Sequence, residues 1–382
     1  MLLTAIGAPS LAIWLYLVLA RGGFWLARER DDRDPPAEPA TWPSVTAVVP
    51  ARDEADVIGR AMGGLLAQDY PGLFRVILVD DQSADGTADI AQRAVDEDGR
   101  LRVIQGKPLP AGWTGKLWAL AQGVEQASQG AAPDYVLLTD ADIGHAPGNL
   151  RALVARAEAG RLTLTAQMVR LHCRTGPDKL LIPAFVFFFQ MLFPFAWVND
   201  PKRRTAAGPG GCMLVRREAL EAAGGIAAVR AEIIDDCALA ARLKQQGPIW
   251  LGLTERAESL RPYETLGEIG RMISRSAYAQ LDYSPWRLAG TLAGMAVTYL
   301  APPILVLVGD GVAWAAGATA WILMWVSFQP TLRLYRRSPL WGLALPVIGA
   351  IYTWYTVQSA VQVWQGRGGQ WKGRAQAIVG PA

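Results

Sequence analysis

Between residues 44 and 142 the sequence alternates short runs rich in β-branched residues with longer amphipathic segments. The short runs predict buried strands and the longer segments predict helices, because their apolar residues recur with the matching periods. Strands that alternate with helices pair mostly in parallel, and the helices then cover both faces of the sheet. We therefore expect an α/β, Rossmann-like nucleotide-binding half with strands at 44–51, 74–81, 101–106 and 134–142, and helices at 53–68, 87–98 and 116–127.

The same domain is expected to continue to residue 286. Its later elements are a strand at 162–169, a strand and helix within 211–225, and a helix at 235–247. The apolar segment 180–198 lies between two of these strands, so a single crossing of a membrane there would split the domain. We expect an interfacial helix instead. Aromatic side chains crowd every face of it, which favours lipid contact over a buried core helix: Phe185, Phe187, Phe188, Phe189, Phe193, Phe195 and Trp197.

Apolar residues make up 51% of the chain and charged residues only 19%, and the apolar excess is concentrated near the two ends. Residues 2–20 carry no charge, and a segment of about 20 apolar residues crosses a bilayer as a helix. Arg21, Arg28 and Arg30 follow, which places the next domain on the cytoplasmic side by the positive-inside rule. We expect an uncleaved transmembrane anchor at 1–21 and a proline-rich linker at 22–43.

The C-terminal region 287–364 is also predicted to lie in a membrane. Its candidate spans are 288–308, 312–330 and 340–363, and the basic run Arg333, Arg336, Arg337 predicts a cytoplasmic turn before the last of them. Three full crossings would put the tail 365–382 outside. If that tail is cytoplasmic, as we expect, one of the segments is re-entrant or interfacial. The protein is predicted to be a multi-pass protein of the inner cell membrane.

Acidic residues follow three of the predicted strands. The first strand leads into Asp53-Glu54, the second ends at Asp80-Asp81, and the fourth ends at Asp140-Ala141-Asp142. Ligands of open α/β sheets bind beyond the carboxyl ends of the strands. Asp140 and Asp142 would point the same way in an extended segment, as a hard divalent ion shared with substrate phosphates requires. We expect Mg²⁺ or Mn²⁺ at Asp140 and Asp142.

These motifs resemble those of the family 2 glycosyltransferases, which have the GT-A fold. The stretch Pro50–Glu54 is similar to the family's P-x-x-[DN]-E opening, Gly115-Lys116 to its G-K, and Asp140–Asp142 to its D-x-D. The resemblance implies a nucleotide-sugar donor, which we expect to be UDP-linked. It also implies a set of donor-binding residues: Pro50, Arg52, Glu54, Asp80, Asp81, Ser83, Lys116, Asp140, Arg271, Arg275, Trp371, Lys372 and Arg374.

The motif Asp235-Asp236 resembles the family's [ED]-D, in which the second acid is the catalytic base. An inverting transfer needs one carboxylate to take the proton of the acceptor hydroxyl, while a metal ion holds the leaving diphosphate. Asp236 could instead cap the helix that it begins. Gly210 and Gly211 are similar to the residues that line the acceptor site in this family.

Two details narrow the resemblance. The Q-x-x-R-W motif of processive members is absent, because only Arg275 fits it in the sequence 272–276, so transfer of a single sugar is expected. The tail residues Trp371-Lys372-Gly373-Arg374 are similar to the W-[RK]-G-R of ceramide-glucosyltransferase-like members. Together with the segments 301–303 and 329–342, they most resemble the hopene-associated glycosyltransferases. This implies a membrane lipid acceptor, either a hopanoid or a related lipid.

Several other classes are weighed against this interpretation. A polyprenyl-phosphate sugar synthase would need no base, and a non-catalytic membrane scaffold could share the fold. A dehydrogenase would carry G-x-G-x-x-G after the first strand, where this chain has P-A-R-D-E-A. A net charge of +3 without basic blocks argues against nucleic acid as a partner. The three scattered cysteines predict neither a zinc site nor a disulfide framework, and His145 is expected in a polar loop.

Overall fold

The computed structural model describes residues 2–94, 96, 99–368, 370–371 and 374–375. The chain divides into two compact units. A helical unit contains residues 1–28, 173–196 and 262–368, and an α/β unit contains residues 29–172, 197–261 and the described residues after 368. The division differs from the domain limits expected from the sequence, because most of segment 180–198 and everything from Pro262 to Gly368 cluster with the N-terminal helix.

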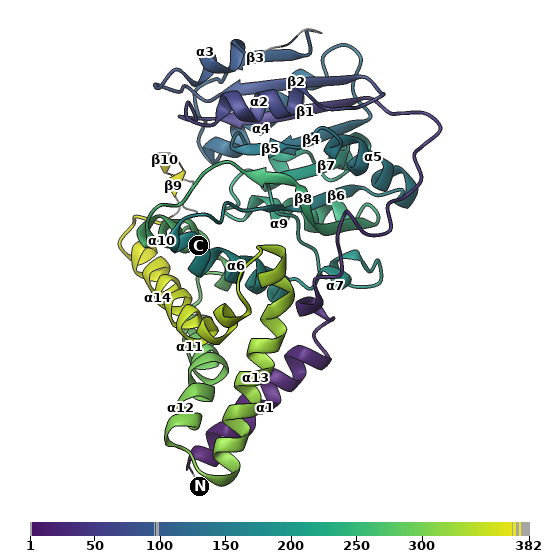
Figure 1. Ribbon diagram of the computed structural model, residues 1–382. Helices are drawn as coiled ribbons and strands as arrows, with labels where there is room; N and C mark the ends of the chain where they lie inside the picture. Colours follow the sequence, from purple (N-terminus) through teal and green to yellow (C-terminus); the bar gives the residue numbers. More distant parts are fainter. Residues whose placement is uncertain (1, 95, 97–98, 369, 372–373, 376–382) are drawn as a thin grey trace. The chain divides into compact units, whose positions relative to one another are not determined.

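The described part of the α/β unit has one eight-stranded sheet, in the order β3-β2-β1-β4-β7-β6-β8-β5 (Figure 1). Four of the seven neighbouring pairs are parallel and three are antiparallel, so the sheet is mixed rather than mostly parallel as expected. Strand β7 pairs antiparallel with β4 on one side and with β6 on the other, so it runs opposite to both of its neighbours. The strands are β1 Val45–Ala51, β2 Phe74–Asp80, β3 Leu101–Gln105, β4 Tyr135–Thr139, β5 Ile143–His145, β6 Leu164–Arg170, β7 Cys212–Arg216 and β8 Ile249–Ser259.

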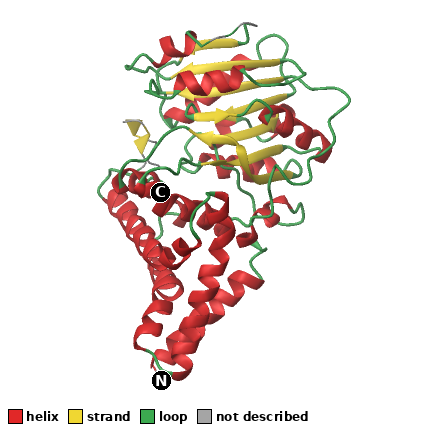
Figure 2. Ribbon diagram, in the orientation of Figure 1, coloured by secondary structure: helices red, strands yellow, loops and turns green. Residues whose placement is uncertain are grey.

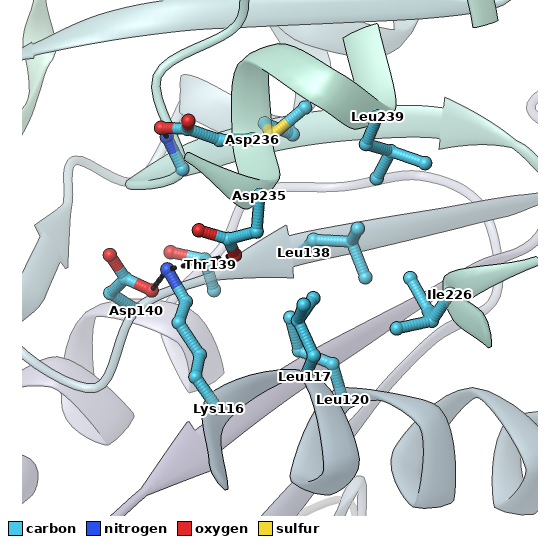
Figure 3. A pocket seen from close by; sticks show the side chains of 12 residues that line it. Lys116, Leu117, Leu120, Leu138, Thr139, Asp140, Ile226, Asp235, Asp236 and Leu239 are labelled. Atoms are coloured by element: carbon cyan, nitrogen blue, oxygen red, sulfur yellow. Dashed lines mark hydrogen bonds and ion pairs between the residues drawn. The ribbon is translucent and has the colours of Figure 1, made fainter. Parts of the chain in front are cut away.

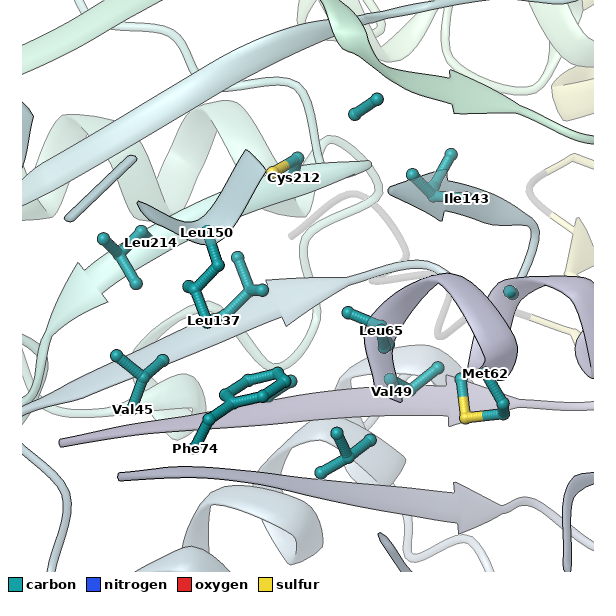
Figure 4. Packing of buried hydrophobic residues seen from close by; sticks show 14 of the residues in the cluster. Val45, Val49, Met62, Leu65, Phe74, Leu137, Ile143, Leu150, Cys212 and Leu214 are labelled. Carbon is teal, nitrogen blue, oxygen red and sulfur yellow. The ribbon is translucent and has the colours of Figure 1, made fainter. Parts of the chain in front are cut away.

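Helices cover both faces of this sheet (Figure 2). On one face, alternate residues of β1, β2 and β4 meet α2 and α5 in a continuous apolar core, in which Val49, Leu65 and Leu137 are buried (Figure 4). On the other face, α4 lies so close to β1 that a Cβ at Gly123 would collide with Val48. The helices of this unit are α2 Ile58–Leu66, α3 Thr87–Gln92, α4 Gly115–Ala127, α5 Asn149–Gly160, α8 Arg217–Ala222 and α9 Asp235–Lys244.

Part of the expected linker belongs to the α/β unit. Arg30 forms a parallel bridge with Leu253 of β8, and the amide N–H of Asp31 donates to the Leu253 carbonyl at 3.1 Å. The Asp31 carboxylate is buried, where it accepts hydrogen bonds from Gln167 and Thr254. The strand pairing ties this segment to β8, so the interpretation of 22–43 as a plain linker is wrong for residues 29–31.

The described part of the helical unit contains three helical segments long and apolar enough to cross a membrane: Pro285–Val308, Gly311–Leu334 and Pro339–Trp364. They agree with the three C-terminal spans expected from the sequence. The first segment consists of α11 Pro285–Met295, a wider π turn at Ala296–Leu300 and α12 Ala301–Val308. The second is α13, and the third contains α14 Leu345–Trp364.

The N-terminal helix α1, Leu2–Leu19, is apolar but shorter than these three segments. It packs beside α13 (Figure 1), where a Cβ at Gly7 would lie 3.3 Å from the Ala316 side chain. Small residues of this kind let apolar helices approach closely. At the end of α1, Arg21 donates hydrogen bonds to the carbonyls of Met191 and Leu192 in α6.

The aromatic segment 180–198 forms α6, Gly176–Leu192, followed after Pro194 by α7, Phe195–Asn199. Phe187 and Phe188 of α6 are buried within the helical unit, where Phe187 contacts Phe24 and Phe328. Much of α6 is thus a core helix of this unit. The expectation that aromatic residues on every face contact lipid is wrong for the buried ones.

Candidate active site

A pocket of the α/β unit brings together four of the predicted site residues: Lys116, Asp140, Asp235 and Asp236 (Figure 3). They come from the start of α4, the end of β4 and the start of α9. Gly210, which precedes β7, also lines this pocket. The remaining wall is apolar apart from Thr139: Leu117, Leu120, Leu138, Met213, Ile226 and Leu239. Polar groups therefore converge at one side of an otherwise apolar cavity, as in many ligand sites.

Lys116 is the second residue of α4, after the Thr114 N-cap and Gly115. Its Nζ is 2.8 Å from an Asp140 carboxylate oxygen and 3.9 Å from one of Asp235. Burial lowers the pKa of Lys116, but the charges of Asp140, Asp235 and Asp236 outweigh burial and raise the pKa overall. A helix N-terminus disfavours a cation, so the carboxylates hold this lysine charged where the helix alone would not.

Asp236 is fixed by two backbone donors in the first turn of α9. The amide N–H of Gly210 donates to its Oδ2 at 2.9 Å, and the amide N–H of Cys237 donates to its Oδ1 at 2.7 Å. The N-cap position belongs to Ile234, whose side chain forms no cap. Asp236 therefore does not act as the N-cap that the sequence left open as an alternative.

Burial raises the pKa of Asp236 to about 6, and the neighbouring charge of Asp235 adds to the rise. Lys116 and the two backbone donors partly oppose this rise. A carboxylate whose pKa lies near neutral pH is well suited to accept a proton as a general base.

The D-x-D segment is not extended. Residues 141 and 142 form a turn between β4 and β5, so the two carboxylates do not point the same way by strand geometry. Asp140 pairs with Lys116, whereas Asp142 lies 3.3 Å from Nε of Arg261. Among the described residues, no three His, Cys, Asp or Glu side chains are grouped as a ready-made metal site.

Arg261 was not predicted from the sequence. It follows β8, and its guanidinium contacts both Asp142 and Glu54. A signal was present in part, because Ile249, Leu251 and Leu253 recur at every second position and a strand end is where ligand-binding residues gather. Neither β8 nor the short β5 was expected, and the arginine was therefore missed.

The loops after β1 and β2 are joined by hydrogen bonds. The amide N–H groups of Asp53, Glu54 and Ala55 donate to side-chain oxygens of Ser83, Thr87 and Asp85, at 2.8 to 3.0 Å. Asp53 has a left-handed backbone conformation with φ 50°, so α2 begins only at Ile58 and not at residue 53.

The acids at the end of β2 are both buried. The Arg52 guanidinium donates to the Asp81 carbonyl, and its Nη1 lies 3.9 Å from the Asp81 carboxylate. One carboxylate oxygen of Asp80 has no hydrogen-bond partner among the described residues. Pro50 is buried within β1. Loop 52–55 and strand end 80–83 are thus held next to each other by hydrogen bonds.

The other predicted residues have different surroundings. Gly211 accepts a hydrogen bond from Thr139 through its carbonyl. Arg271 and Arg275 are exposed one turn apart at the end of α10, Leu266–Ser274, in the helical unit. Of the tail, the structure describes only backbone strands that pair antiparallel, β9 Gln370–Trp371 and β10 Arg374–Ala375; Lys372 lies outside the described residues.

His145 lies at the end of β5 and is buried rather than in a polar loop. Its ring nitrogens lie 2.9 Å from the Thr139 hydroxyl and 3.0 Å from the Asn149 amide, and burial lowers its pKa to about 4. It is therefore a neutral core histidine at pH 7. The three cysteines are free thiols.

Residues 46–224 match the model of the family described as glycosyl transferase family 2. The chain carries a glycosyltransferase family 2 domain. The matched stretch includes Lys116, Asp140 and Gly210 of the pocket, and it ends before Asp235 and Asp236. No curated protein matches the chain.

Among solved structures, the mannosyltransferase PcManGT from Pyrobaculum calidifontis, in complex with GDP-Man and Mn²⁺, matches 95% of this chain and 99% of its own, with 20% identity and a TM-score of 0.54. TarS residues 1–349 from S. aureus, in complex with UDP-GlcNAc, matches 85% of this chain and 92% of its own, with 14% identity and a TM-score of 0.42. Mannosyl-3-phosphoglycerate synthase from Rubrobacter xylanophilus matches 66% of this chain and 80% of its own, with 18% identity and a TM-score of 0.40. The first similarity shows a shared fold of the expected GT-A type.

The protein is a glycosyltransferase, which rejects the interpretation as a non-catalytic scaffold. The family 2 domain and the GT-A fold expected from its motifs are confirmed. The narrower resemblance to hopene-associated or ceramide-glucosyltransferase-like enzymes stays a prediction, as do the assigned roles of the glycosyltransferase's individual site residues.

Proposed function

We propose that the protein is an inverting, metal-dependent glycosyltransferase that moves one sugar from a nucleotide-sugar donor to a membrane lipid. The observation that carries this proposal is that the half-buried side chains of Asp236 and Lys116 line one pocket: a carboxylate with a raised pKa and a lysine held charged. A base for the acceptor and a cation for the leaving diphosphate are the two groups that such a transfer requires.

In the proposed reaction, Asp236 accepts the proton of the acceptor hydroxyl. The N–H groups of Gly210 and Cys237 hold its carboxylate in one orientation, so a hydroxyl that enters beside Gly210 meets a fixed oxygen. Attack from the side of Asp236, with the diphosphate leaving toward Lys116, inverts the anomeric carbon in one step. No covalent intermediate on the enzyme is needed.

The donor is proposed to lie over the loops after β1 and β2, with its diphosphate near Lys116. Asp80, whose buried carboxylate oxygen has an unused acceptor position among the described residues, is suited to accept from the base or ribose. PcManGT was solved with GDP-Man and TarS with UDP-GlcNAc. A UDP-linked sugar remains our preferred donor.

Asp140 and Asp142 are proposed to hold Mg²⁺ or Mn²⁺. The donor set fits, because Mg²⁺ is commonly bound by one or two carboxylates together with substrate phosphates rather than by a complete protein cage. PcManGT was solved with Mn²⁺. When bound, the ion would neutralise charge that develops on the leaving diphosphate. Lys116 supplies a further positive charge on the same side of the pocket.

The acceptor is proposed to be a hopanoid or a related lipid of the inner cell membrane, with the α/β unit in the cytoplasm. Three membrane-length helical segments support a membrane-bound enzyme. The arginines after α1 and at 333–337 support this orientation.

The proposal is tested by incubating the purified, bilayer-reconstituted protein with Mn²⁺, a lipid extract and a panel of radiolabelled nucleotide sugars. We expect one donor to label a lipid, with release of the matching nucleotide and inversion at the anomeric carbon. Absence of labelled lipid with every donor, or retention of configuration, would reject it. Labelling of polyprenyl phosphate alone would point to the alternative synthase, in which Asp236 is dispensable.

A further inference from the structure

Arg261 connects two acids that the sequence assigned to donor and metal binding. Its Nε lies 3.3 Å from Oδ2 of Asp142, and its Nη2 pairs with the Glu54 carboxylate. About a third of the Arg261 side chain is exposed, whereas Glu54 is buried. The guanidinium therefore holds a buried acid of the β1 loop beside an acid of the β4–β5 turn.

The backbone fixes this arrangement. The amide N–H of Leu260 donates to the Asp142 carbonyl at 2.7 Å, and β5 pairs with the end of β8 through Ile143 and Ser259. The Leu260 side chain packs on Gly144, where an added Cβ would lie 3.0 Å from it. Arg261 and Asp142 are thus neighbours by strand register, and only the side chain of Arg261 has to move for the pair to open.

Asp140, the other acid of the D-x-D, has its own cation. Lys116 Nζ lies 2.8 Å from it, so each acid that would bind a divalent ion already carries one positive side chain. Glu54 and Asp235 lie beside the same two cations. A divalent ion that enters alone must displace both cations from Asp140 and Asp142 without offering them phosphate oxygens instead.

We propose that Arg261 is the counter-ion of Asp142 in the donor-free enzyme and a diphosphate-binding cation in the donor complex. The sugar diphosphate carries two negative charges and the metal ion two positive charges. When they enter together, the carboxylates exchange their cations for the metal ion, and Lys116 and Arg261 turn to the phosphate oxygens. The entering ion and diphosphate carry equal and opposite charges, so the exchange leaves the net charge of the site unchanged and favours binding of metal and donor as one unit.

This inference rests on the proposed function, because it assumes a nucleotide-sugar donor and a metal ion at Asp142. In this proposal Arg261 competes with the metal ion for the Asp142 carboxylate, which a purely structural arginine would not do. Removing the guanidinium should therefore make the donor-free protein bind metal more tightly, whereas damage to the fold would weaken binding.

The test is a titration of the full-length, detergent-solubilised protein with Mn²⁺ alone, followed by the electron paramagnetic resonance of free Mn²⁺. We expect Arg261→Gln to bind Mn²⁺ about two- to fivefold more tightly than the unchanged protein, the factor that corresponds to a partly exposed ion pair. The Mn²⁺ affinity of Arg261→Lys should lie between that of Arg261→Gln and that of the unchanged protein. In transfer assays, Arg261→Gln should raise the donor KM more than it lowers kcat.

Arg256→Gln is the matched control, because Arg256 lies on β8 and faces the buried Asp31 instead. It should leave Mn²⁺ affinity unchanged. Equal or weaker Mn²⁺ binding in Arg261→Gln would overturn the inference while leaving the proposed function intact. If Asp142→Asn in the Arg261→Gln background does not abolish the added affinity, Asp142 is not the metal ligand, and the proposed metal site fails as well.

Discussion

Gly210 donates its amide hydrogen to Oδ2 of Asp236 at 2.9 Å, and the space beside its Cα is bounded by Lys116 and Asp236. A Cβ at this position would lie 3.0 Å from Lys116 Nζ and 3.5 Å from Asp236. The residue is thus a backbone contact between the proposed base and the proposed phosphate-binding lysine, and it leaves no room for a side chain without displacing the lysine.

Gly210→Ala should therefore lower kcat/KM by about ten- to a hundredfold, the range that follows when catalytic groups are misplaced. The fold should be retained, because Lys116 Nζ is the end of a flexible side chain. Steady-state kinetics with the donor that labels lipid in the nucleotide-sugar panel measure the effect. Gly63→Ala is the control, since a Cβ there would meet nothing within 4 Å. Equal rates for both variants would contradict the assigned contact.

The pH dependence of transfer should follow Asp236. Burial raises its pKa to about 6, and only the deprotonated form can accept the acceptor proton. We expect kcat/KM to rise about tenfold per pH unit below pH 6 and to level off above it. A profile measured from pH 4.5 to 8.5 tests this. Rates that stay constant below pH 6 would rule out Asp236 as the base.

Asp236 should also limit stability. Its folded pKa lies above the ordinary value of 3.8, so the cost of burying its charge is absent at low pH, grows between 3.8 and about 6, and stays at roughly 3 kcal/mol above that. Asp236→Asn should raise the melting temperature at pH 8 by more than it does at pH 5. Thermal unfolding at both pH values measures this, with the exposed Asp89→Asn as control. An unchanged melting temperature at pH 8 would contradict the cost assigned to this carboxylate.

The segment at residues 29–31 should contribute to stability through Asp31. Its buried carboxylate accepts the Thr254 hydroxyl at 2.5 Å and the Gln167 amide at 3.0 Å, and Asp31→Ala would leave both donors without this acceptor. We expect a loss of about 2–4 kcal/mol in the free energy of unfolding. Asp32→Ala removes an exposed pair with Arg30 and should cost less than about 1 kcal/mol. Denaturant unfolding measures both losses. Equal losses for Asp31→Ala and Asp32→Ala would show that the buried contacts of Asp31 do not stabilise the fold.

Much of the α/β unit could be predicted from the sequence, because β1, β2, β4 and β6 are apolar runs with clear limits. Lys116, Asp140 and Asp236 could be grouped for the same reason: each follows or begins an element whose end is easy to recognise. Strand β8 was missed because Glu255, Arg256 and Glu258 interrupt its apolar pattern. Because β8 was missed, Arg261 and the antiparallel pair of β5 with β8 were missed too, whereas the other two antiparallel pairs come from the direction of β7 in the sheet.

Tertiary contacts explain the other differences. Residues 29–31 were interpreted as a linker because their polar sequence does not indicate that they pair with β8. Phe187 and Phe188 suggested lipid contact because hydropathy does not distinguish lipid from the interior of a helix bundle. The turn at Asp142 could not be foreseen from the spacing of two acids, since the short β5 that follows it is set by pairing with Ser259 and Ala257.

The proposed function depends most on Asp236, which would take the proton of the lipid hydroxyl while the donor lies over the loops after β1 and β2 with its diphosphate near Lys116. The most direct measurement compares kcat of Asp236→Asn with that of the unchanged enzyme at saturating donor and acceptor, with nucleotide affinity measured in parallel. We predict a loss of at least about a hundredfold in kcat, the typical contribution of a general base, with nucleotide affinity changed less than about threefold. Undiminished kcat in Asp236→Asn would contradict the account.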